Sequence, residues 1–221
     1  MLQYLVFDLD ETIYPRGSGL MQAISERISR YMIERLAMDP VAVPGLRRLY
    51  WEKYGTTSRG LQLLHAIDVE DYMTFVHDVP LADYIGPNPE LDQALSGLAQ
   101  RKIVFTNATE EHARAVLNAV GVAHHFEAVF DALFFGNEVK PAPGAYQKLL
   151  DQLGVDGHVC LLIEDSARNL LPAQQLGMLT VLVDPPQGAE TDGADYCIAR
   201  ISDIASVVYD IENKQADKDR G

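Results

Sequence analysis

A short apolar run near the start of the chain ends in two aspartates that are separated by one residue. Residues 3–8 read as a buried strand, and Asp8 and Asp10 stand where that strand stops. A strand buried in a parallel sheet has no reason to hold charged side chains, so these acids belong at the carboxyl end of the sheet. Open α/β folds place their ligand sites at that end. We therefore predict an α/β fold in which Asp8 and Asp10 work as a pair.

The second half of the chain alternates between strand-like and helix-like segments. We predict strands over 102–106, 128–135, 159–163 and 179–183, a weak strand over 195–198, and helices over 90–100, 109–120, 143–153 and 167–176. Strands and helices that alternate with short connections form parallel sheets covered on both faces. The sequence therefore predicts a Rossmann-like parallel sheet with helices on both faces.

A block of helical pattern separates the first strand from this alternation. Apolar residues recur at helical spacing over 20–38, and shorter helices are predicted over 44–54, 58–66 and 68–77. Because the block follows the first strand directly, the simplest interpretation is an α-helical insertion close to the strand ends. Insertions at such positions commonly gate a site.

These boundaries divide the chain into three parts. Residues 1–14 and 90–212 are predicted to form a discontinuous α/β core, and residues 15–89 a helical cap. The segment 213–221 is polar and charged, and we predict a disordered tail there.

The overall charge of the chain excludes some classes of partner. Its 221 residues are 48% apolar and carry 18 basic and 32 acidic side chains, so the net charge is 18 − 32 = −14. Such a chain is poorly suited to nucleic-acid polymers, whose phosphates attract cationic proteins. No segment has the pattern of a signal peptide or the length of a membrane helix. We expect a cytoplasmic protein in which Cys160 and Cys197, which lack zinc-binding spacing, are reduced.

Polar residues of different kinds follow the later strands. Thr106-Asn107 ends the second strand, Glu164-Asp165 ends a later one, and Lys140 lies between them. Taken singly, each residue could be a helix cap, a turn residue or a surface lysine. Together with Asp8 and Asp10, however, they provide oxygen ligands for Mg²⁺ and donors for a phosphoryl group. The combination predicts a site for a small phosphorylated metabolite.

Four motifs in this order resemble the haloacid dehalogenase-like superfamily of hydrolases. Residues 8–12 match its D-x-D-x-T motif, and Thr106 matches the Thr or Ser that ends its second strand. Lys140-Pro141 matches its lysine motif, and Glu164-Asp165 its paired acids, where Glu replaces the commoner Asp. Each motif follows a predicted strand or precedes a predicted helix, as the resemblance requires.

The resemblance implies a role for each residue of these motifs. Asp8 would be the nucleophile and a magnesium ligand, and Asp10 the general acid/base, with its backbone carbonyl on the metal. Lys140 would neutralise Asp8 and the phosphate. The phosphoryl group would be bound by Thr106 and Asn107, and the metal also by Asp165 directly and by Glu164 directly or through water.

A closer resemblance is to the pyrimidine 5′-nucleotidase branch of this superfamily. Residues 10–15 and 105–108 are similar to its motifs, and Tyr54, Thr56 and Thr57 lie where its cap would meet a substrate. A plain helix connector is the competing interpretation for these three residues. His65 and His77 are interpreted as structural.

The resulting hypothesis is a Mg²⁺-dependent phosphomonoesterase that acts on a nucleoside 5′-monophosphate, preferably a pyrimidine one, through phospho-Asp8. One alternative is a sugar phosphomutase of the same superfamily. Another, of a different class, is a protein that binds a phosphorylated ligand without turnover. Dehalogenation is disfavoured because carbon–halogen displacement does not need Asp10. Substrate, oligomeric state and the exact role of Glu164 are left open by the sequence.

Overall fold

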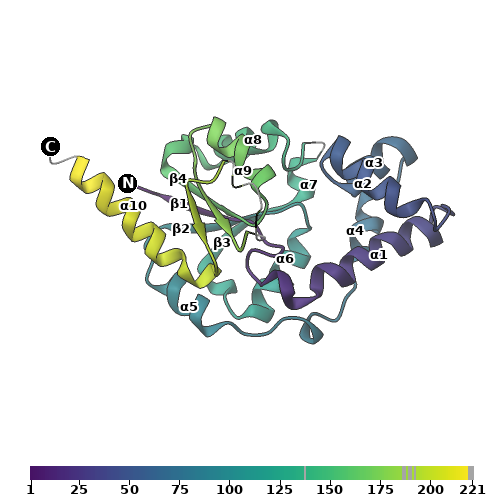
Figure 1. Ribbon diagram of the computed structural model, residues 1–221, viewed down its shortest axis with the longest axis horizontal. Helices are drawn as coiled ribbons and strands as arrows, with labels where there is room; N and C mark the ends of the chain where they lie inside the picture. Colours follow the sequence, from purple (N-terminus) through teal and green to yellow (C-terminus); the bar gives the residue numbers. More distant parts are fainter. Residues whose placement is uncertain (137, 186–187, 189–190, 192, 219–221) are drawn as a thin grey trace.

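The computed structural model describes residues 1–136, 138–185, 188, 191 and 193–218, and its core is a parallel sheet (Figure 1). The six strands lie in the order β3-β2-β1-β4-β5-β6, and every pair is parallel. They are β1 (Tyr4–Phe7), β2 (Arg101–Phe105), β3 (Phe126–Phe130), β4 (Cys160–Glu164), β5 (Leu179–Val183) and β6 (Tyr196–Ile198). The predicted Rossmann-like parallel sheet is thereby confirmed.

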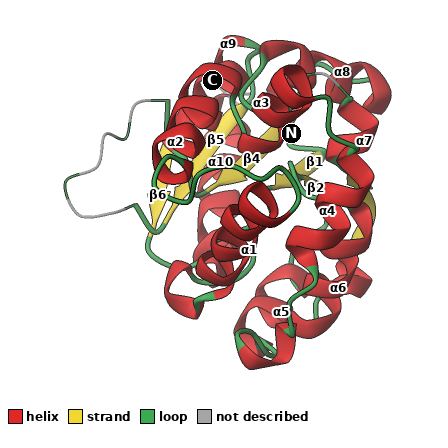
Figure 2. Ribbon diagram, turned by 90° about the vertical axis from the view of Figure 1, so that its right-hand side faces the viewer, coloured by secondary structure: helices red, strands yellow, loops and turns green. Residues whose placement is uncertain are grey.

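Helices cover both faces of the sheet, as Figure 2 shows around the strands. Leu5 and Phe7 of β1 belong to one apolar cluster, and Tyr4 and Val6 to the other, because successive side chains of a strand point to opposite faces. The first cluster includes α5 (Pro89–Ser96), α6 (Glu110–Val120) and α10 (Ile204–Lys218); the second includes α7 (Ala132–Phe135), α8 (Pro143–Leu153) and α9 (Ala167–Gln175). Each fully buried large apolar side chain stabilises this arrangement by roughly 1.5–3 kcal/mol.

Successive strands are added to the sheet on opposite sides of β1. From β1 the chain adds β2 and β3 on one side, and it then adds β4, β5 and β6 on the other. The N–H of Asp8 donates to the carbonyl of Ile163 at 2.9 Å, so the ladder continues one residue beyond β1. The crevice at the carboxyl ends of such strands is the usual ligand site of open α/β sheets.

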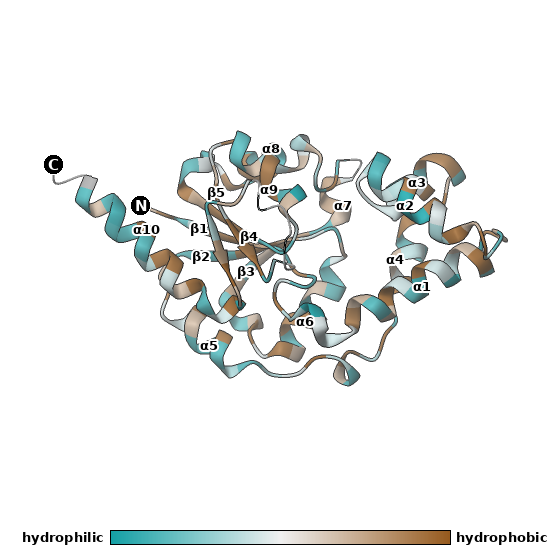
Figure 3. Ribbon diagram, viewed as in Figure 1, coloured by the Kyte–Doolittle hydropathy of each residue, from teal (hydrophilic) through white to brown (hydrophobic). Residues whose placement is uncertain are grey.

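Four helices lie beside this edge of the sheet (Figure 1). They are α1 (Leu20–Glu34), α2 (Val43–Tyr54), α3 (Thr57–His65) and α4 (Val69–His77). The side chain of Thr56 caps α3 by accepting from the N–H of Arg59, and Asp68 caps α4 in the same way. Brown segments alternate with paler and teal ones along these helices in Figure 3. Tyr31, Met32 and Tyr72 are buried and belong to the second apolar cluster. These helices fall within the predicted 15–89 insertion, and we refer to them as the cap.

Two sequence predictions are wrong in detail. The segment 128–135 is not one strand, because β3 ends at Phe130 and α7 follows. Asp131 causes the break: its side chain accepts from the N–H of Phe134 at 2.8 Å and from that of Glu110 at 2.9 Å.

The predicted disordered tail is the second error. The 213–221 segment is helical to Lys218 as part of α10, and residues 219–221 lie outside the described part. Ile204, Val208 and Ile211 anchor α10 on the sheet, and the i,i+4 ion pair of Asp210 and Lys214 extends it. Among the helices that the structure describes, none is long and apolar enough to span a membrane.

Candidate active site

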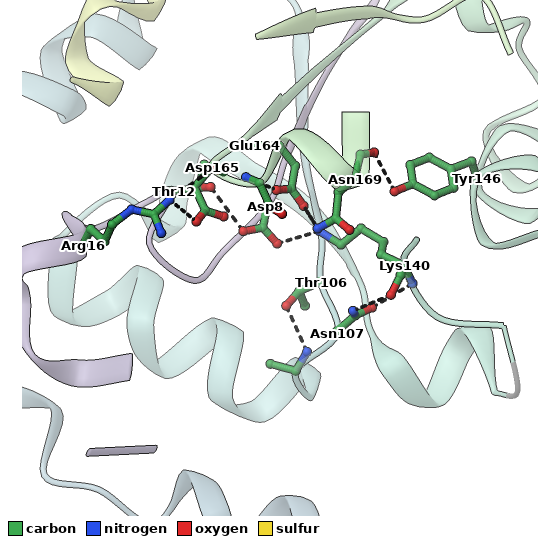
Figure 4. A network of polar contacts seen from close by, with 12 residues as sticks. Asp8, Thr12, Arg16, Thr106, Asn107, Lys140, Tyr146, Glu164, Asp165 and Asn169 are labelled. Atoms are coloured by element: carbon green, nitrogen blue, oxygen red, sulfur yellow. Dashed lines mark hydrogen bonds and ion pairs between the residues drawn. The ribbon is translucent and has the colours of Figure 1, made fainter. Parts of the chain in front are cut away.

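A buried lysine joins the ends of the two central strands (Figure 4). Lys140 Nζ donates to Asp8 Oδ1 at 2.6 Å and to Glu164 Oε1 at 2.8 Å. Burial alone would lower the pKa of Lys140, but Asp8 and Glu164 raise it above its ordinary value, so the amine stays charged. The lysine therefore fixes both carboxylates at the sheet edge, as the parallel register between β1 and β4 allows.

Glu164 is fully buried, and both of its oxygens are engaged. Besides Lys140, Oε1 accepts from Asn169 Nδ2 at 2.6 Å, and Oε2 accepts from the N–H of Ser166 at 2.9 Å. The sequence pattern indicates none of these partners except the lysine. Asn169 lies on α9, five residues after Glu164, so the turn between β4 and α9 sets this contact.

Asp8, Glu164 and Asp165 have the composition of a cation site. One oxygen from each carboxylate lies within 4.8 Å of the others. Burial and the neighbouring carboxylates raise the pKa of Asp8 to about 7, although Lys140 opposes the shift. Burial, Asp8 and Glu164 likewise raise the pKa of Asp165 to about 8. The carboxylates thus repel one another when charged, and a divalent cation that prefers oxygen ligands, such as Mg²⁺, fits this donor set.

Arg16 is a second cation of the site that the sequence did not reveal. It lies in the 3₁₀ turn Arg16–Ser18, just before α1, and its Nη2 donates to Asp165 Oδ2 at 2.6 Å. Its Nη1 also pairs with Glu11 at 3.0 Å. Four carboxylates pair with Lys140 or Arg16, and Asp10 lines the same cavity, which leaves 5 − 2 = 3 unbalanced negative charges when all are ionised. This excess also favours a bound cation.

Thr106 and Asn107 follow β2 at the same edge and line the same cavity as Asp8. Thr106 is buried, and its Oγ1 accepts from the N–H of Ala108 at 3.0 Å, which leaves its own O–H to donate. The amide of Asn107 is bonded to the backbone of Lys140 in both directions, at 2.9 Å each. Asn107 therefore positions the lysine, a contact that the sequence pattern does not show.

Asp10 lies in a pocket of groups that come mostly from outside its own motif. Tyr14 Oη donates to Asp10 Oδ1 at 2.7 Å. His112 Nε2, in the buried first turn of α6, lies 3.7 Å from the same oxygen, and the ring of His77 from α4 stacks on His112 at 4.1 Å. Burial alone would raise the pKa of Asp10. The contacts with His112 and Tyr14 outweigh this effect and lower the pKa below its ordinary value. The free site thus keeps Asp10 ionised at neutral pH.

A cavity of about 270 Å³ connects these residues with the cap. From the cap, Trp51, Gly55 and Thr56 line it, whereas Tyr54 and Thr57 are not among the described residues that do. Of the three cap residues expected at the substrate, the structure thus places only Thr56 at the cavity.

Trp51 and Arg168 close one side of the cavity between cap and core. The guanidinium of Arg168, on α9, stacks on the Trp51 ring at 4.2 Å, and its Nη1 donates to the Trp51 carbonyl at 3.0 Å. Sequence analysis missed both residues, because an exposed tryptophan within a helix of the cap carries no signal of a partner on the core.

The comparison with protein families gives a match over most of the chain. Residues 2–177 match the model of the haloacid dehalogenase-like hydrolases. The match includes every motif residue at the carboxyl edge of the sheet, from Asp8 to Asp165.

Individual proteins similar to this chain carry several names. It is 27% identical to Phosphate metabolism protein 8 of Saccharomyces cerevisiae over 78% of this chain, but the match spans only 58% of the yeast protein. It is 26% identical to a phosphoglycolate phosphatase of Caulobacter vibrioides, with 90% of this chain and 88% of that protein covered. It is 23% identical to a 5′-nucleotidase of Pseudomonas aeruginosa, with 85% of each chain covered.

A solved structure shares the fold. A haloacid dehalogenase-like protein from Agrobacterium tumefaciens superposes with a TM-score of 0.62 at 20% identity, over 96% of this chain and all of the other. The similarity therefore includes the sheet and the helical insertion together.

Proposed function

Because this chain belongs to the haloacid dehalogenase-like hydrolases, we propose that it is a Mg²⁺-dependent phosphatase. In this proposal it hydrolyses a small phosphate monoester through a phosphoryl group carried on Asp8. The observation that supports it most is the buried arrangement of Asp8, Lys140 and Glu164, with Asp10 and Thr106 at the same cavity. The residues that we propose as nucleophile, acid/base, hydrogen-bond donor to the phosphate and cation ligands thus lie close together.

Asp8, Asp165 and the backbone carbonyl of Asp10 are the groups that we assign to the metal. Asp8, Asp10 and Asp165 line the cavity, whereas Glu164 is fully buried and is not among the described residues that line it. We therefore assign Glu164 to the metal through a water and to the orientation of Lys140. Bound Mg²⁺ would offset the charge of the carboxylates and of the phosphoryl oxygens.

In the first half-reaction a carboxylate oxygen of Asp8 attacks the phosphorus atom. The bond to the leaving oxygen breaks, its electron pair stays with that oxygen, and Asp10 supplies the proton. Asp10 is ionised in the free protein, but a phosphate dianion beside it raises its pKa and favours protonation. The Thr106 hydroxyl donates to a phosphoryl oxygen, and the Lys140 amine balances the charge on Asp8.

In the second half-reaction Asp10 acts as the base. It takes a proton from a water, the water oxygen attacks phosphorus, and the bond to Asp8 breaks with its electron pair returning to the carboxylate. The net change is a monoester and water converted to an alcohol and phosphate. The cap excludes bulk water from the cavity while the acyl phosphate is present.

The form of the cavity supports a nucleoside 5′-monophosphate as the substrate. Thr56 and Asn107 also line an adjoining cavity of about 90 Å³ that runs between α3 and α7, which extends the space beyond the phosphate end. Trp51 supplies an aromatic surface at the rim. This space suits a leaving group larger than glycolate, although relatives of both names exist.

A phosphate-release screen tests the substrate. It compares UMP, CMP, purine monophosphates, phosphoglycolate and sugar phosphates with Mg²⁺ and with EDTA. We expect Mg²⁺-dependent release that is fastest with a pyrimidine nucleotide. Faster release from phosphoglycolate would contradict the substrate class alone, whereas conversion of a sugar phosphate to its isomer without free phosphate would contradict hydrolysis.

Replacing the nucleophile tests the mechanism. Asp8→Asn is expected to lower turnover by about 10⁴-fold or more. It should fold, since it removes a buried carboxylate whose pKa burial raises, and thermal unfolding checks this. Asp151→Asn, an exposed change of the same kind on α8, is the control and should turn over normally. A folded Asp8→Asn protein with normal turnover would refute the assignment.

A further inference from the structure

A second group of metal-ligating side chains lies outside the candidate active site. Asp92 is in α5, and His124 and His125 form the 3₁₀ turn between α6 and β3. Nε2 of His125 lies 2.8 Å from Asp92 Oδ1, and Nε2 of His124 lies 3.1 Å from the same oxygen. All three potential ligand atoms lie within 4.8 Å of one another. From this convergence we propose that Asp92, His124 and His125 form a second metal site, one that binds Zn²⁺.

The spacing of the three atoms suits one small cation. With bonds of about 2.0–2.1 Å, two ligands of a metal lie about 2.9 Å apart at a right angle and about 3.4 Å apart at a tetrahedral angle. The two nitrogen–oxygen distances, 2.8 and 3.1 Å, lie close to this range. The site thus needs only small side-chain movements to close on a metal.

The donor set separates this site from the catalytic one. Two imidazole nitrogens and one carboxylate oxygen suit Zn²⁺, whereas Mg²⁺ prefers oxygen ligands alone, as Asp8, Glu164 and Asp165 provide. The Zn²⁺ site therefore does not depend on the proposed phosphatase activity.

Packing already orients the ligands. The side chain of His125 is only 10% exposed, and its ring lies against that of His124 with the centroids 4.0 Å apart. The side chains of His124 and Asp92 are 63% and 42% exposed, so the site opens to solvent. Water can complete the coordination on that side, as in zinc sites with three protein ligands.

The location gives the site a structural role. The N–H of Asn88, just before α5, donates to the carbonyl of Val120 at the end of α6. Asp92 and His125 are also within hydrogen-bond distance, and a metal held by Asp92 and the two histidines would replace that contact with coordinate bonds between α5 and the connection from α6 to β3. Because it would bind the folded state only, it would raise the unfolding temperature.

Isothermal titration of the full-length chain with Zn²⁺ tests the proposal. Millimolar Mg²⁺ is present to fill the catalytic carboxylates, and all proteins carry Cys197→Ser to remove an exposed thiol. We expect one Zn²⁺ per chain and at least about tenfold weaker binding in His124→Gln and in Asp92→Asn. Zn²⁺ should also raise the unfolding temperature of the parent but not of these two variants.

His158→Gln is the matched control. His158 is an exposed histidine that lies outside the site, so the variant should bind Zn²⁺ as the parent does. His124 and Asp92 are partly exposed, so their variants are expected to fold, and circular dichroism checks this. No binding by the parent, equal affinity in His124→Gln and Asp92→Asn, or an equal loss in His158→Gln would overturn the proposal.

Discussion

At the scale of single residues, the position of Asp10 depends on neighbours that the D-x-D spacing does not indicate. Tyr14 donates to Asp10 Oδ1, and His112 approaches the same oxygen from α6. The tyrosine is almost fully buried, so its hydroxyl has one orientation relative to the carboxylate. The proposed acid/base is thus held by groups from two different elements.

Removing the tyrosine hydroxyl tests this positioning. A hydrogen bond to a charged group contributes about 1.5–3 kcal/mol, so Tyr14→Phe is expected to lower kcat by about 10- to 100-fold. KM should change little, because Asp10 acts on the leaving oxygen. Steady-state kinetics with the best substrate of the screen measure both constants.

Tyr31→Phe is the control for this variant. Tyr31 is also buried, and its hydroxyl donates to Asp71 within the cap. Its kcat should stay within about twofold of the parent value, since neither Tyr31 nor Asp71 is among the described residues that line the cavity. A Tyr14→Phe enzyme with the kcat of the parent would mean that the hydrogen bond does not position Asp10.

At the scale of elements, the turn between α2 and α3 lies directly against the loop that carries Lys140. Gly55 adopts a φ of +89°, and a Cβ at this position would lie 3.1 Å from Pro141 Cδ and 3.3 Å from the Lys140 carbonyl. A side chain is therefore disfavoured both by the backbone conformation and by the neighbouring loop. The glycine allows the cap to reach the core at the cavity.

Gly55→Ala is expected to move the turn away from Lys140 and Pro141. We predict a loss of about 1–2 kcal/mol in the free energy of unfolding and a fall in kcat/KM of roughly tenfold or more. Denaturant unfolding and steady-state kinetics are the measurements. Wild-type values of both would show that the close approach does not matter for cap placement.

Gly45 offers a matched control in α2, the helix that leads into this turn. It lies in α2 and is exposed, and a Cβ atom at this position would have no neighbouring atom within 4 Å. Gly45→Ala should stabilise the protein by about 0.5–1 kcal/mol, because alanine loses less backbone entropy in a helix, and it should leave kcat/KM unchanged.

At the scale of the whole molecule, the crowded carboxylates link stability to pH and to the metal. Burial raises the pKa of Asp8 to about 7 in the fold, from 3.8 for the exposed group. Between these values the folded protein holds a proton that the unfolded chain has released, so this group lowers the free energy of unfolding as pH rises through the window. Asp165 acts in the same direction up to about pH 8.

Mg²⁺ should therefore stabilise the protein more at pH 8 than at pH 6, because protons compete with the metal for the same oxygens. Replacing EDTA with Mg²⁺ should raise the unfolding temperature at both pH values, and the rise should be at least about 3 °C larger at pH 8 than at pH 6. In a protein of this chain length, a difference of roughly 1 kcal/mol in the free energy of unfolding produces such a shift. Thermal unfolding at matched ionic strength measures it. An equal or larger rise at pH 6 would contradict the metal assignment.

Much of the fold follows from local pattern. Helical spacing of apolar residues that ends at Gly154 predicts the helix 143–153, and a mostly apolar run predicts the strand 179–183, both with the observed ends. The pattern fails at 128–135, where one apolar run predicts a single strand but Asp131 ends the strand and caps a helix. It fails again at 213–218, where packing of α10 on the sheet extends a polar segment as helix. At 128–135 a capping residue inside the run decides the structure, whereas at 213–218 the packing of residues before the segment does.

The sequence by itself indicated the residues of the candidate site. Asp8, Asp10, Thr106, Glu164 and Asp165 are marked by their places at strand ends, because a parallel sheet brings those ends to one edge, and Lys140 is marked by the motif that it forms with Pro141. Only the tertiary structure decided what holds them. Asn107 positions Lys140, Arg16 pairs with Asp165, Trp51 packs on Arg168, and Asp92 faces His124 and His125. These partners are more than 30 residues apart in the chain. Such contacts depend on strand register and on how the cap meets the core, whereas local sequence encodes only periodicity and capping.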